Sequence, residues 1–261
     1  MKPLRIGCVK YLNARPLIRG WPGCIEFDHP SVLCERLAKG ELDVALVSSF
    51  EFLRNPIYRI VDEVSISSDG PVYSVVVAHH DDISEIQEIE LDPASQTAVN
   101  LLRCLHAEEG FSPRLVRRNT GVSPAGAKSI SARRAQLLIG DQAIRFRESH
   151  AGEFRFWDLG EQWKKLIGLP FDYALWLIRP EVADPRQIAN RLRALREENL
   201  SNLDELVSVE TEFDHQFCVS YYREHLRFSF GEEEKEGLRT FAKLCAKHGL
   251  LEESDLKFDL V

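Results

Sequence analysis

The chain lacks the features by which several large protein classes are recognised. Its 261 residues contain no apolar run close to the ~20 residues that a bilayer span requires. No two cysteines form the Cys-x-x-Cys pair that holds zinc or a redox disulfide. The apolar stretch at the N-terminus is interrupted by Lys10 and is too short for a secretory signal. These absences argue against an integral membrane protein and predict a cytoplasmic location.

Basic charge is scarce as well, with 33 Lys and Arg against 41 Asp and Glu and a net charge of −8. Residues 1–80 hold nine basic and nine acidic residues, 81–172 hold 12 and 14, and 173–261 hold 12 and 18. A nucleic-acid-binding domain is normally strongly basic, so we expect no nucleic-acid partner. An anionic ligand is expected in the first half, where the acidic excess is absent.

Recognisable nucleotide, hydrolase and metal motifs are missing too. The sequence has no G-x-x-x-x-G-K-[ST] or G-x-G-x-x-G loop and no G-x-S-x-G elbow. His79-His80 precedes Asp81-Asp82, but neighbouring side chains on a strand point to opposite faces, so we expect no metal site there. The cysteines are expected to stay reduced and to pack as small apolar groups. They are Cys8, Cys24, Cys34, Cys104, Cys218 and Cys245.

Short apolar runs alternate with helical patterns and predict an α/β fold with parallel or mixed sheets. A final stretch reads as helical only, so we expect two α/β units with a helical C-terminal tail. Strands are predicted at 4–9, 43–47, 58–61, 72–78, 87–91, 114–118, 135–141, 154–160 and 172–178. The tail helices are predicted at 185–199, 201–211, 214–225 and 232–249.

Polar residues follow several predicted strands, at residues 10–15, 47–49, 95–97 and 140–141. Ligands of open α/β sheets bind at such strand ends, where free N–H groups of helix starts favour carboxylate or phosphate. Each residue also has a structural interpretation. Ser48, Ser95 and Asp141 could cap helices, Asn13 could be a turn residue, and Lys10 and Arg15 could simply be solvated.

Longer motifs stand in order along nearly the whole chain. They are IGCVKYLNARPL, ELDVALVSSFEFLRN, GPVYSVVV, LDPASQTAVNLL, LLIGDQAI, WDLGEQWKKLIGLPFDYALW and FGEEEKEGLRTFAKLCAKHGL. Together they resemble the menaquinone-biosynthesis family that includes the chorismate dehydratases of the futalosine pathway. The combination of YLNARPL, LVSS, LIGD and GLPF is specific, whereas any one of them alone is weak.

The resemblance implies a fold and a division into lobes. Members of this family resemble two-lobed periplasmic binding proteins of the second type, in which the chain crosses twice between lobes. Here the expected crossings are strands 72–78 and 172–178. The first lobe would comprise residues 1–77 plus 175–261, and the second lobe residues 78–174, with the substrate cleft between them.

The implied activity is that of a hydro-lyase without metal or organic cofactor. Chorismate, a small dicarboxylate, would lose water to give 3-[(1-carboxyvinyl)oxy]benzoate, and aromatisation supplies the driving force. The protein must hold both carboxylates, polarise the departing hydroxyl and position a base. No histidine falls within the matching motifs. The base is therefore left open among a substrate carboxylate, a bound water and Asp141.

The resemblance also implies roles for single residues. Asn13 and Ser74 would be the catalytic contacts with the substrate in the cleft. Polar groups of the substrate would meet the serines of LVSS, one carboxylate would lie at the SQT helix start, and LIGD would supply the opposite wall. The implied substrate-binding set is Tyr11, Arg15, Ser48, Ser49, Ser95, Thr97 and Asp141.

Two other functions compete with this one. A sister enzyme of the same pathway, which forms a dihydroxynaphthoate, has a Pro-Asn-Asp loop after its first strand and a histidine base, and neither feature is visible here. A non-catalytic binding protein for small organic anions is expected to carry a signal peptide or a lipid-attachment cysteine. This chain instead begins at its first strand, which favours the dehydratase.

Overall fold

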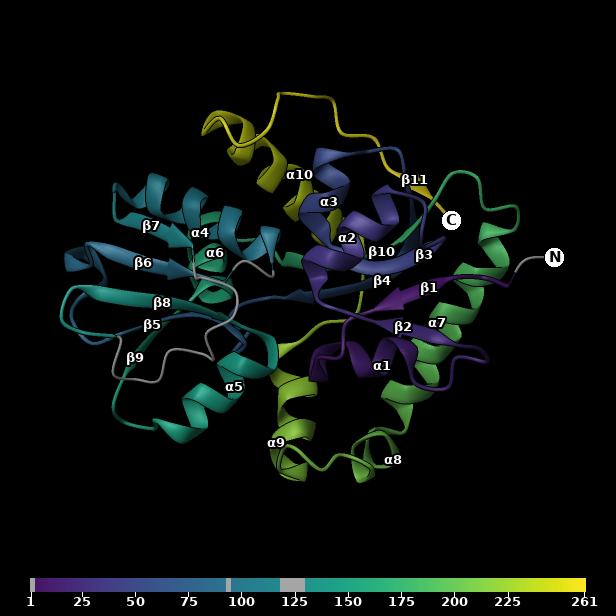
Figure 1. Ribbon diagram of the computed structural model, residues 1–261, viewed down its shortest axis with the longest axis horizontal. Coiled ribbons are helices and arrows are strands. Elements are labelled where there is room, and N and C mark those ends of the chain that lie inside the picture. Colours follow the sequence, from purple (N-terminus) through teal and green to yellow (C-terminus); the bar gives the residue numbers. More distant parts are fainter. Residues whose placement is uncertain (1–2, 93–94, 118–129) are drawn as a thin grey trace.

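The computed structural model describes residues 3–92, 95–117 and 130–261. Two β-sheets lie side by side, the five-stranded sheet at the left of Figure 1 and the six-stranded sheet at the right. Helices cover both sheets, and the final third of the chain is mainly helical (Figure 1). The predicted α/β fold with a helical C-terminal tail is confirmed.

The six-stranded sheet has the order β11-β4-β10-β3-β1-β2. Strand β1 pairs in parallel with β2 and β3, whereas β10 runs antiparallel to β3 and β4, so the sheet is mixed. All residues of β3 are buried, in keeping with the continuous apolar run of a central strand. The strands are β1 (Ile6–Cys8), β2 (Ile25–Phe27), β3 (Val44–Ser48), β4 (Arg59–Ser68), β10 (Phe171–Ile178) and β11 (Asp259–Leu260).

The five-stranded sheet has the order β7-β6-β8-β5-β9. Strands β7, β6 and β8 are parallel neighbours, and β5 runs antiparallel to β8 and β9. Strand β8 ends directly at the start of a helix, as expected for a ligand-binding edge. The strands are β5 (Val75–His79), β6 (Glu88–Leu91), β7 (Arg114–Arg117), β8 (Arg134–Ile139) and β9 (Arg155–Asp158).

The helices follow the predicted order with shifted ends. Those among the strands are α1 (Arg15–Ile18), α2 (Pro30–Ala38), α3 (Ser49–Arg54), α4 (Gln96–Glu109), α5 (Gly140–Ser149) and α6 (Leu159–Ile167). The tail contains α7 (Pro185–Ser201), α8 (Leu203–Ser208), α9 (His215–Ser220) and α10 (Glu232–Lys247). Short 3-10 helices, η1 (Leu12–Ala14) and η2 (Ile83–Glu85), and a π-helix, η4 (Tyr221–His225), complete the described elements.

The chain passes between the sheets just before the two strands that were expected to be the crossings. Strand β4 belongs to the six-stranded sheet and β5 to the other, so the first passage lies in residues 69–74. The second passage lies in residues 159–170, which contain α6. Residues 72–74 of the first expected crossing strand lie in the first passage, whereas β5 and β10 themselves each pair within a single sheet.

The Asp158 carboxylate links the two passages. It accepts hydrogen bonds from the backbone N–H groups of Val72 at 3.0 Å and Tyr73 at 2.8 Å. It also caps α6 by accepting from Gly160 and Glu161 at 3.0 and 3.2 Å. Burial raises the pKa of this carboxyl, and these N–H groups partly offset the shift.

The interpretation of three tryptophans as core residues is confirmed. Trp157, Trp163 and Trp176 are buried in the core. All six cysteines are free, and Cys24 alone among them is exposed. His79 is buried with its Nδ1 against the Asp81 carbonyl oxygen at 2.7 Å. Within the described ranges, no group of three His, Cys, Asp or Glu side chains is placed to hold a metal ion.

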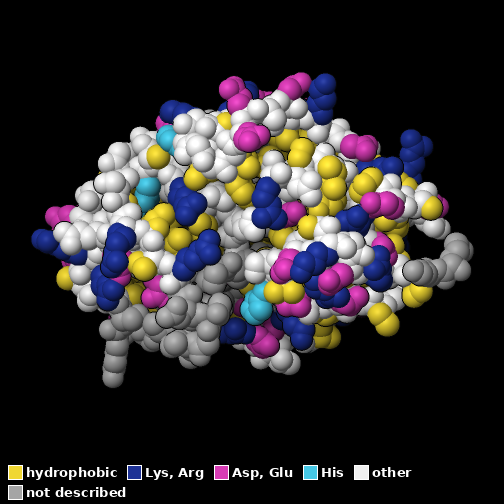
Figure 2. Space-filling model, turned by 45° about the horizontal axis from the view of Figure 1, so that its top comes forward, with side chains coloured by type: hydrophobic (Ala, Val, Ile, Leu, Met, Phe, Trp, Pro, Cys, Tyr) yellow, Lys and Arg dark blue, Asp and Glu magenta, His cyan; other side chains and the backbone are white. Residues whose placement is uncertain are grey.

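The surface carries charges of both signs. On the face shown in Figure 2, Lys and Arg side chains are interspersed with Asp and Glu and with hydrophobic side chains. No single-sign patch therefore dominates this face. Among the described residues, no helix combines the length and the apolar character that a bilayer crossing demands.

Candidate active site

A small cavity lies between the two sheets and receives side chains from both. Its volume is about 60 Å³, which is room for about two water molecules. Three polar side chains, those of Asn13, Ser48 and Ser95, line it together, and because Gly140 borders it too, all four predicted strand-end segments meet at one place. The other residues around it are Val9, Tyr11, Pro30, Leu46, Val47, Ile66, Val75, Ile139, Gly140, Tyr173 and Ala174.

The loop after β1 presents Asn13 to this cavity. Leu12 and Ala14 are buried on the core side of the short helix η1, which leaves Asn13 directed outward from the core. Its Oδ1 atom is shielded from solvent and has no hydrogen-bond partner among the described residues. A buried amide oxygen without a partner is costly, so this atom is suited to receive a ligand donor.

Asp141 holds this loop from the other sheet. Its Oδ1 accepts a hydrogen bond from the Leu12 N–H at 2.8 Å. The side chain is buried, which raises the pKa of its carboxyl, while the Leu12 hydrogen bond and the nearby Arg145 and Arg15 lower it in part. The alternative that Asp141 caps α5 is wrong, because that helix begins at Gly140 and Asp141 lies within its first turn.

Gly140 allows the two segments to approach each other. Its φ is +56°, a left-handed conformation that glycine adopts without strain. A Cβ atom at this position would lie 2.9 Å from the ring of Tyr11. Tyr11 can therefore pack against the backbone of β8's end only because residue 140 has no side chain.

A cluster of hydroxyls joins the sheets beside α3 and α4. The Thr97 N–H donates to Ser48 Oγ at 3.0 Å, and Ser48 Oγ also contacts Thr97 Oγ1. Thr97 Oγ1 accepts from the Phe50 N–H at 3.0 Å and lies 3.2 Å from Ser49 Oγ. Ser49 in turn donates to the carbonyl oxygen of Asp172 at 2.7 Å. The cluster is buried and connects β3 with the start of α4.

The serines differ in their relation to helix ends. Ser95 caps α4, since its Oγ accepts from the Ala98 N–H at 3.2 Å, and it lines the central cavity as well. Ser48 precedes α3 but makes no side-chain cap, so the capping alternative is wrong for it. Ser49 and Thr97 lie behind the cavity wall rather than on it.

Ser74 lies just before β5 and is fully buried. The hydroxyl of Tyr221 donates to its Oγ at 2.7 Å. A side-chain hydrogen bond with Asn13 also acts on Tyr221, although burial is the larger effect and raises the pKa of this phenol. Tyr221 therefore joins Asn13 to Ser74, the two residues expected to be catalytic.

Tyr221 is a candidate site residue that sequence reasoning missed. It begins the π-helix η4, and single π-turns are frequent at functional sites. Its neighbour Tyr222 donates to the Leu12 carbonyl oxygen at 2.9 Å and supports the same loop. The Tyr-Tyr pair inside a predicted tail helix was the available signal, but nothing local indicates contact with residues 12–13 and 74.

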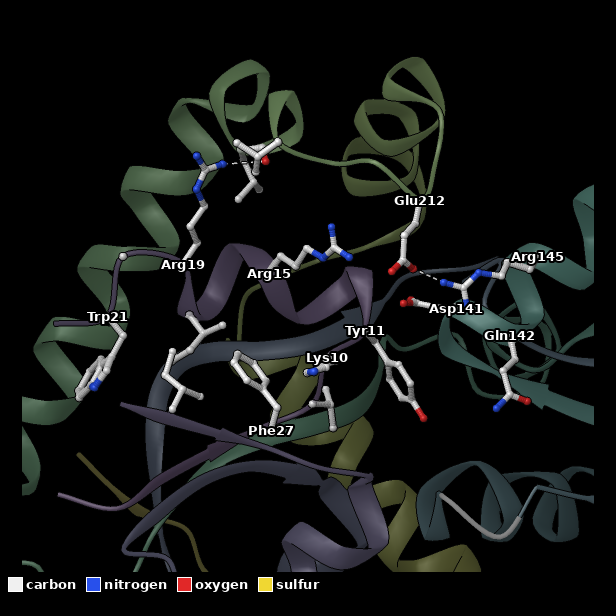
Figure 3. Close-up of a pocket in the computed structure, with 16 residues that line it drawn as sticks. Lys10, Tyr11, Arg15, Arg19, Trp21, Phe27, Asp141, Gln142, Arg145 and Glu212 are labelled. Atoms are coloured by element: carbon white, nitrogen blue, oxygen red, sulfur yellow. Dashed lines mark hydrogen bonds and ion pairs between the residues drawn. The ribbon is translucent and has the colours of Figure 1, made fainter. Parts of the chain in front are cut away.

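A second and larger cavity of about 590 Å³ adjoins the first and shares Val9 and Tyr11 with it. Figure 3 shows its walls, formed by the segment around Lys10, by α5 with Asp141, and by the region after α8 with Glu212. Arg15 lines this outer cavity and forms an ion pair with Glu210. The structure thus separates Arg15 from the central cavity, where it was expected to bind substrate.

Comparison with known proteins identifies the family of this chain. A family model described as menaquinone biosynthesis matches residues 4–247. A chorismate dehydratase of Thermus thermophilus is 30% identical over 265 residues, covering 93% of this chain and 95% of that protein.

Solved structures share the fold. Protein AF1704 from Archaeoglobus fulgidus has a TM-score of 0.72 at 17% identity and covers 95% of this chain and 98% of its own. The alkanesulfonate-binding protein of Xanthomonas axonopodis has a TM-score of 0.66 at 17% identity, covering 97% and 95%. The fold is that of periplasmic binding proteins of the second type. The matched family model and the relative place the function more narrowly: the chain belongs to the menaquinone biosynthesis family.

Proposed function

We propose that the chain is a chorismate dehydratase that removes water from chorismate to give 3-[(1-carboxyvinyl)oxy]benzoate. The family and the full-length relationship support this activity. The observation that carries the assignment of the site is the meeting of Asn13, Ser48 and Ser95 around one cavity, with Asn13 Oδ1 unpartnered among the described residues.

The cavity suits a polar ring acid. Leu46, Ile66 and Val75 supply apolar walls, and the hydroxyls of Ser48 and Ser95 supply donors for a carboxylate. Ser95 also lies at the N-terminus of α4, where the helix dipole favours negative charge. These groups would hold the substrate by hydrogen bonds from neutral donors.

Asn13 is proposed to contact the ring at the departing hydroxyl. Tyr221 and Ser74 would fix the orientation of its amide, because the Tyr221 hydroxyl bridges between them. Asp141 would act through Leu12 by fixing the loop that carries Asn13. In this role Asp141 is a positioning residue, although it was expected to be a substrate contact.

The lining of the central cavity narrows the choice of base. Its described residues include no carboxylate and no histidine, and Asp141 lies on the outer cavity. Burial raises the pKa values of Tyr11 and Tyr173, so both phenols stay protonated near neutral pH. Of the three candidates, a substrate carboxylate or a bound water is therefore favoured over Asp141. The base removes a ring proton, the electron pair of that C–H bond completes the aromatic ring, and the departing hydroxyl takes up a proton from the protonated base, directly or through water, and leaves as water.

The volume of the cavity implies motion. About 60 Å³ is too small for a ten-carbon acid, since ligand pockets usually measure about 300–1,000 Å³. We propose that the two sheets are the cores of two lobes, 1–77 plus 175–261 and 78–174, which separate to admit substrate. These boundaries lie within a few residues of the positions where the chain changes sheet.

The activity is tested directly by mixing the purified protein with chorismate. We expect loss of chorismate and formation of the aromatic enol ether, followed by absorbance and mass spectrometry. Tight binding of chorismate without turnover would contradict the proposal and support an organic-anion-binding protein instead. Formation of a naphthoate from a later intermediate would support the sister enzyme.

A further inference from the structure

The outer cavity of Figure 3 is large, bounded on several sides and outside the proposed catalytic centre. Its volume of about 590 Å³ lies within the range of small-molecule sites. Elements of both sheets form it, because α5 follows β8 whereas Lys10, Trp21 and Phe27 belong to segments around β1 and β2. A molecule bound there would contact both halves of the protein.

Aromatic side chains form much of its wall. Trp21 is partly exposed, Phe27 is 42% exposed and Tyr11 lies at the boundary with the central cavity. Large apolar side chains are seldom left accessible without a reason when they converge on one hollow. Flat rings of this kind favour a planar ring as the bound molecule, through stacked or edge contacts.

The charges around the cavity indicate the sign of that molecule. Arg145 pairs with Glu212, and Arg19 donates to the carbonyl oxygens of Glu205 and Leu206 at 2.7 Å each. Lys10 differs, because it forms no ion pair with any residue in the described parts of the chain. Its Nζ lies 5.9 Å from the centre of the Phe27 ring. An ammonium beside an aromatic wall is suited to the carboxylate of a ring acid.

A further polar group lacks its partner. Gln142 lines the same cavity, and its Oε1 is buried with no hydrogen-bond partner among the described residues. A hydroxyl on the bound molecule would satisfy it. The wall therefore offers a cation for a carboxylate, an amide oxygen for a hydroxyl and flat surfaces for a ring.

We propose that the outer cavity is a second binding site, specific for planar hydroxy-substituted or ether-substituted ring carboxylates. The aromatic ether that the proposed reaction forms belongs to this class, so in that respect the inference rests on the proposed function. The shared wall at Tyr11 and Val9 places this second site next to the catalytic cavity. Such acids would bind there before or after the reaction.

The test uses meta-hydroxybenzoate, an unreactive ring acid with one carboxylate and one hydroxyl. The protein has four tryptophans, of which Trp157, Trp163 and Trp176 are buried in the core. The nuclear magnetic resonance signal of the Trp21 indole N–H, assigned with Trp21→Phe, reports on the outer cavity, which Trp21 lines. We expect this signal to shift saturably during titration. Absence of a saturable shift up to millimolar probe would overturn the proposal.

Two variants separate the outer cavity from the central one. Lys10→Gln should raise the Kd at least about threefold, because it removes the cation that faces the carboxylate. Lys39→Gln, a matched loss of an exposed lysine elsewhere, should leave it unchanged. Asn13→Ala should also leave it unchanged, and a Trp21 shift that vanishes in this variant would place the probe in the central cavity instead. Binding requires no turnover, so a negative result in the chorismate assay leaves this test independent.

Discussion

The two sheets are joined around the central cavity by two contacts that differ in chemistry. Beside α3 and α4, the contact consists of neutral hydroxyl and backbone groups around Thr97 and Ser48. Beside η1 and α5, the Asp141 carboxylate holds the Leu12 amide, and the Arg145–Glu212 ion pair lies nearby. The hydroxyl contact should therefore be insensitive to pH and salt, whereas the carboxylate contact should respond to both.

The difference suggests a division of labour. The hydroxyl contact is fully buried and shares Ser48 and the helix start with the proposed carboxylate site. The carboxylate contact instead fixes the loop that carries the proposed reacting group, Asn13. The hydroxyl contact would serve mainly substrate binding, and the carboxylate contact would serve mainly the chemical step.

The largest expected effect comes from Asn13→Ala, which tests whether the loop on the carboxylate side carries the chemistry. We expect kcat to fall at least about 100-fold, since the substrate loses its proposed contact at the departing hydroxyl. The free energy of unfolding should fall by about 1 kcal/mol or less, because the variant removes an unpartnered oxygen and one side-chain hydrogen bond with Tyr221.

The measurements are steady-state kinetics with chorismate and urea unfolding of the same preparations. Asn190→Ala, an exposed asparagine on α7, is the matched control and should change neither quantity. An Asn13→Ala enzyme with normal turnover would remove this loop from the reaction.

Asp141 is expected to have the next largest effect. Asp141→Ala frees the Leu12 N–H, so kcat should fall about tenfold as the loop loses its anchor. Asp141→Asn keeps an oxygen acceptor in place and should recover most of the activity. Equal losses in both variants would show that the negative charge, rather than the hydrogen bond, is what matters.

The same pair of variants tests the pH response. Burial raises the pKa of Asp141, so the folded protein holds this proton more tightly than the unfolded chain. Stability from this group is therefore complete below the unfolded pKa and is lost as the pH rises through the folded pKa. Asp141→Asn cannot ionise, so its unfolding free energy should gain on that of the parent as the pH rises from the unfolded pKa of aspartate to the higher folded pKa of Asp141. The unfolding free energies come from denaturant titrations at a series of pH values. If those of parent and variant change in parallel with pH, the raised pKa of Asp141 is contradicted.

Thr97→Val should have a smaller effect on activity and a clear effect on stability. Valine keeps the shape but removes the hydroxyl that accepts from Phe50 and contacts Ser48, which leaves buried groups without partners. We expect a loss of about 1–3 kcal/mol of unfolding free energy that is the same at all pH values. Thr97→Ser retains the hydroxyl and serves as the control. A loss of unfolding free energy that depends on pH would contradict the distinction between the two contacts.

The smallest effect is expected for Arg145→Gln. This residue pairs with Glu212 at a half-exposed position and lies over the Phe213 ring. Exposed pairs contribute at most about 1 kcal/mol, and salt screens them. The unfolding free energy of the variant should therefore lie below that of the parent at low ionic strength and converge with it at high salt. A loss that persists in high salt would indicate packing rather than charge.

The fold was largely predictable because its strands are marked by local apolar runs. Strand β3 shows this well, since the apolar run from Val44 to Val47 is buried on both faces, as expected for a central strand. Strand β4 was predicted only at 58–61, although it continues to Ser68. Its second half contains Ser65 and Ser67, whose buried hydroxyls donate to carbonyl oxygens of Ser229 and Arg227. These hydrogen-bond acceptors lie in the C-terminal tail, so the local sequence of β4 gives no sign that its serines can be buried.

The site was predictable in part for the same reason. Asn13, Ser48 and Ser95 follow strands or open helices, so strand-end reasoning brings them to one edge. Arg15 was misplaced because its ion pair with Glu210 depends on how the tail packs. Tyr221 escaped notice because its partner Ser74 lies 147 residues away in the sequence.

That separation has a consequence for protein synthesis. Ribosomes add about 5–20 residues per second, so Tyr221 is made roughly 7 to 30 s after Ser74. Until then a nascent chain can already contain both complete halves of the cavity wall while its asparagine remains unsupported. The newly synthesised enzyme would therefore be inactive, and it would become active only when its last helices pack against the two sheets.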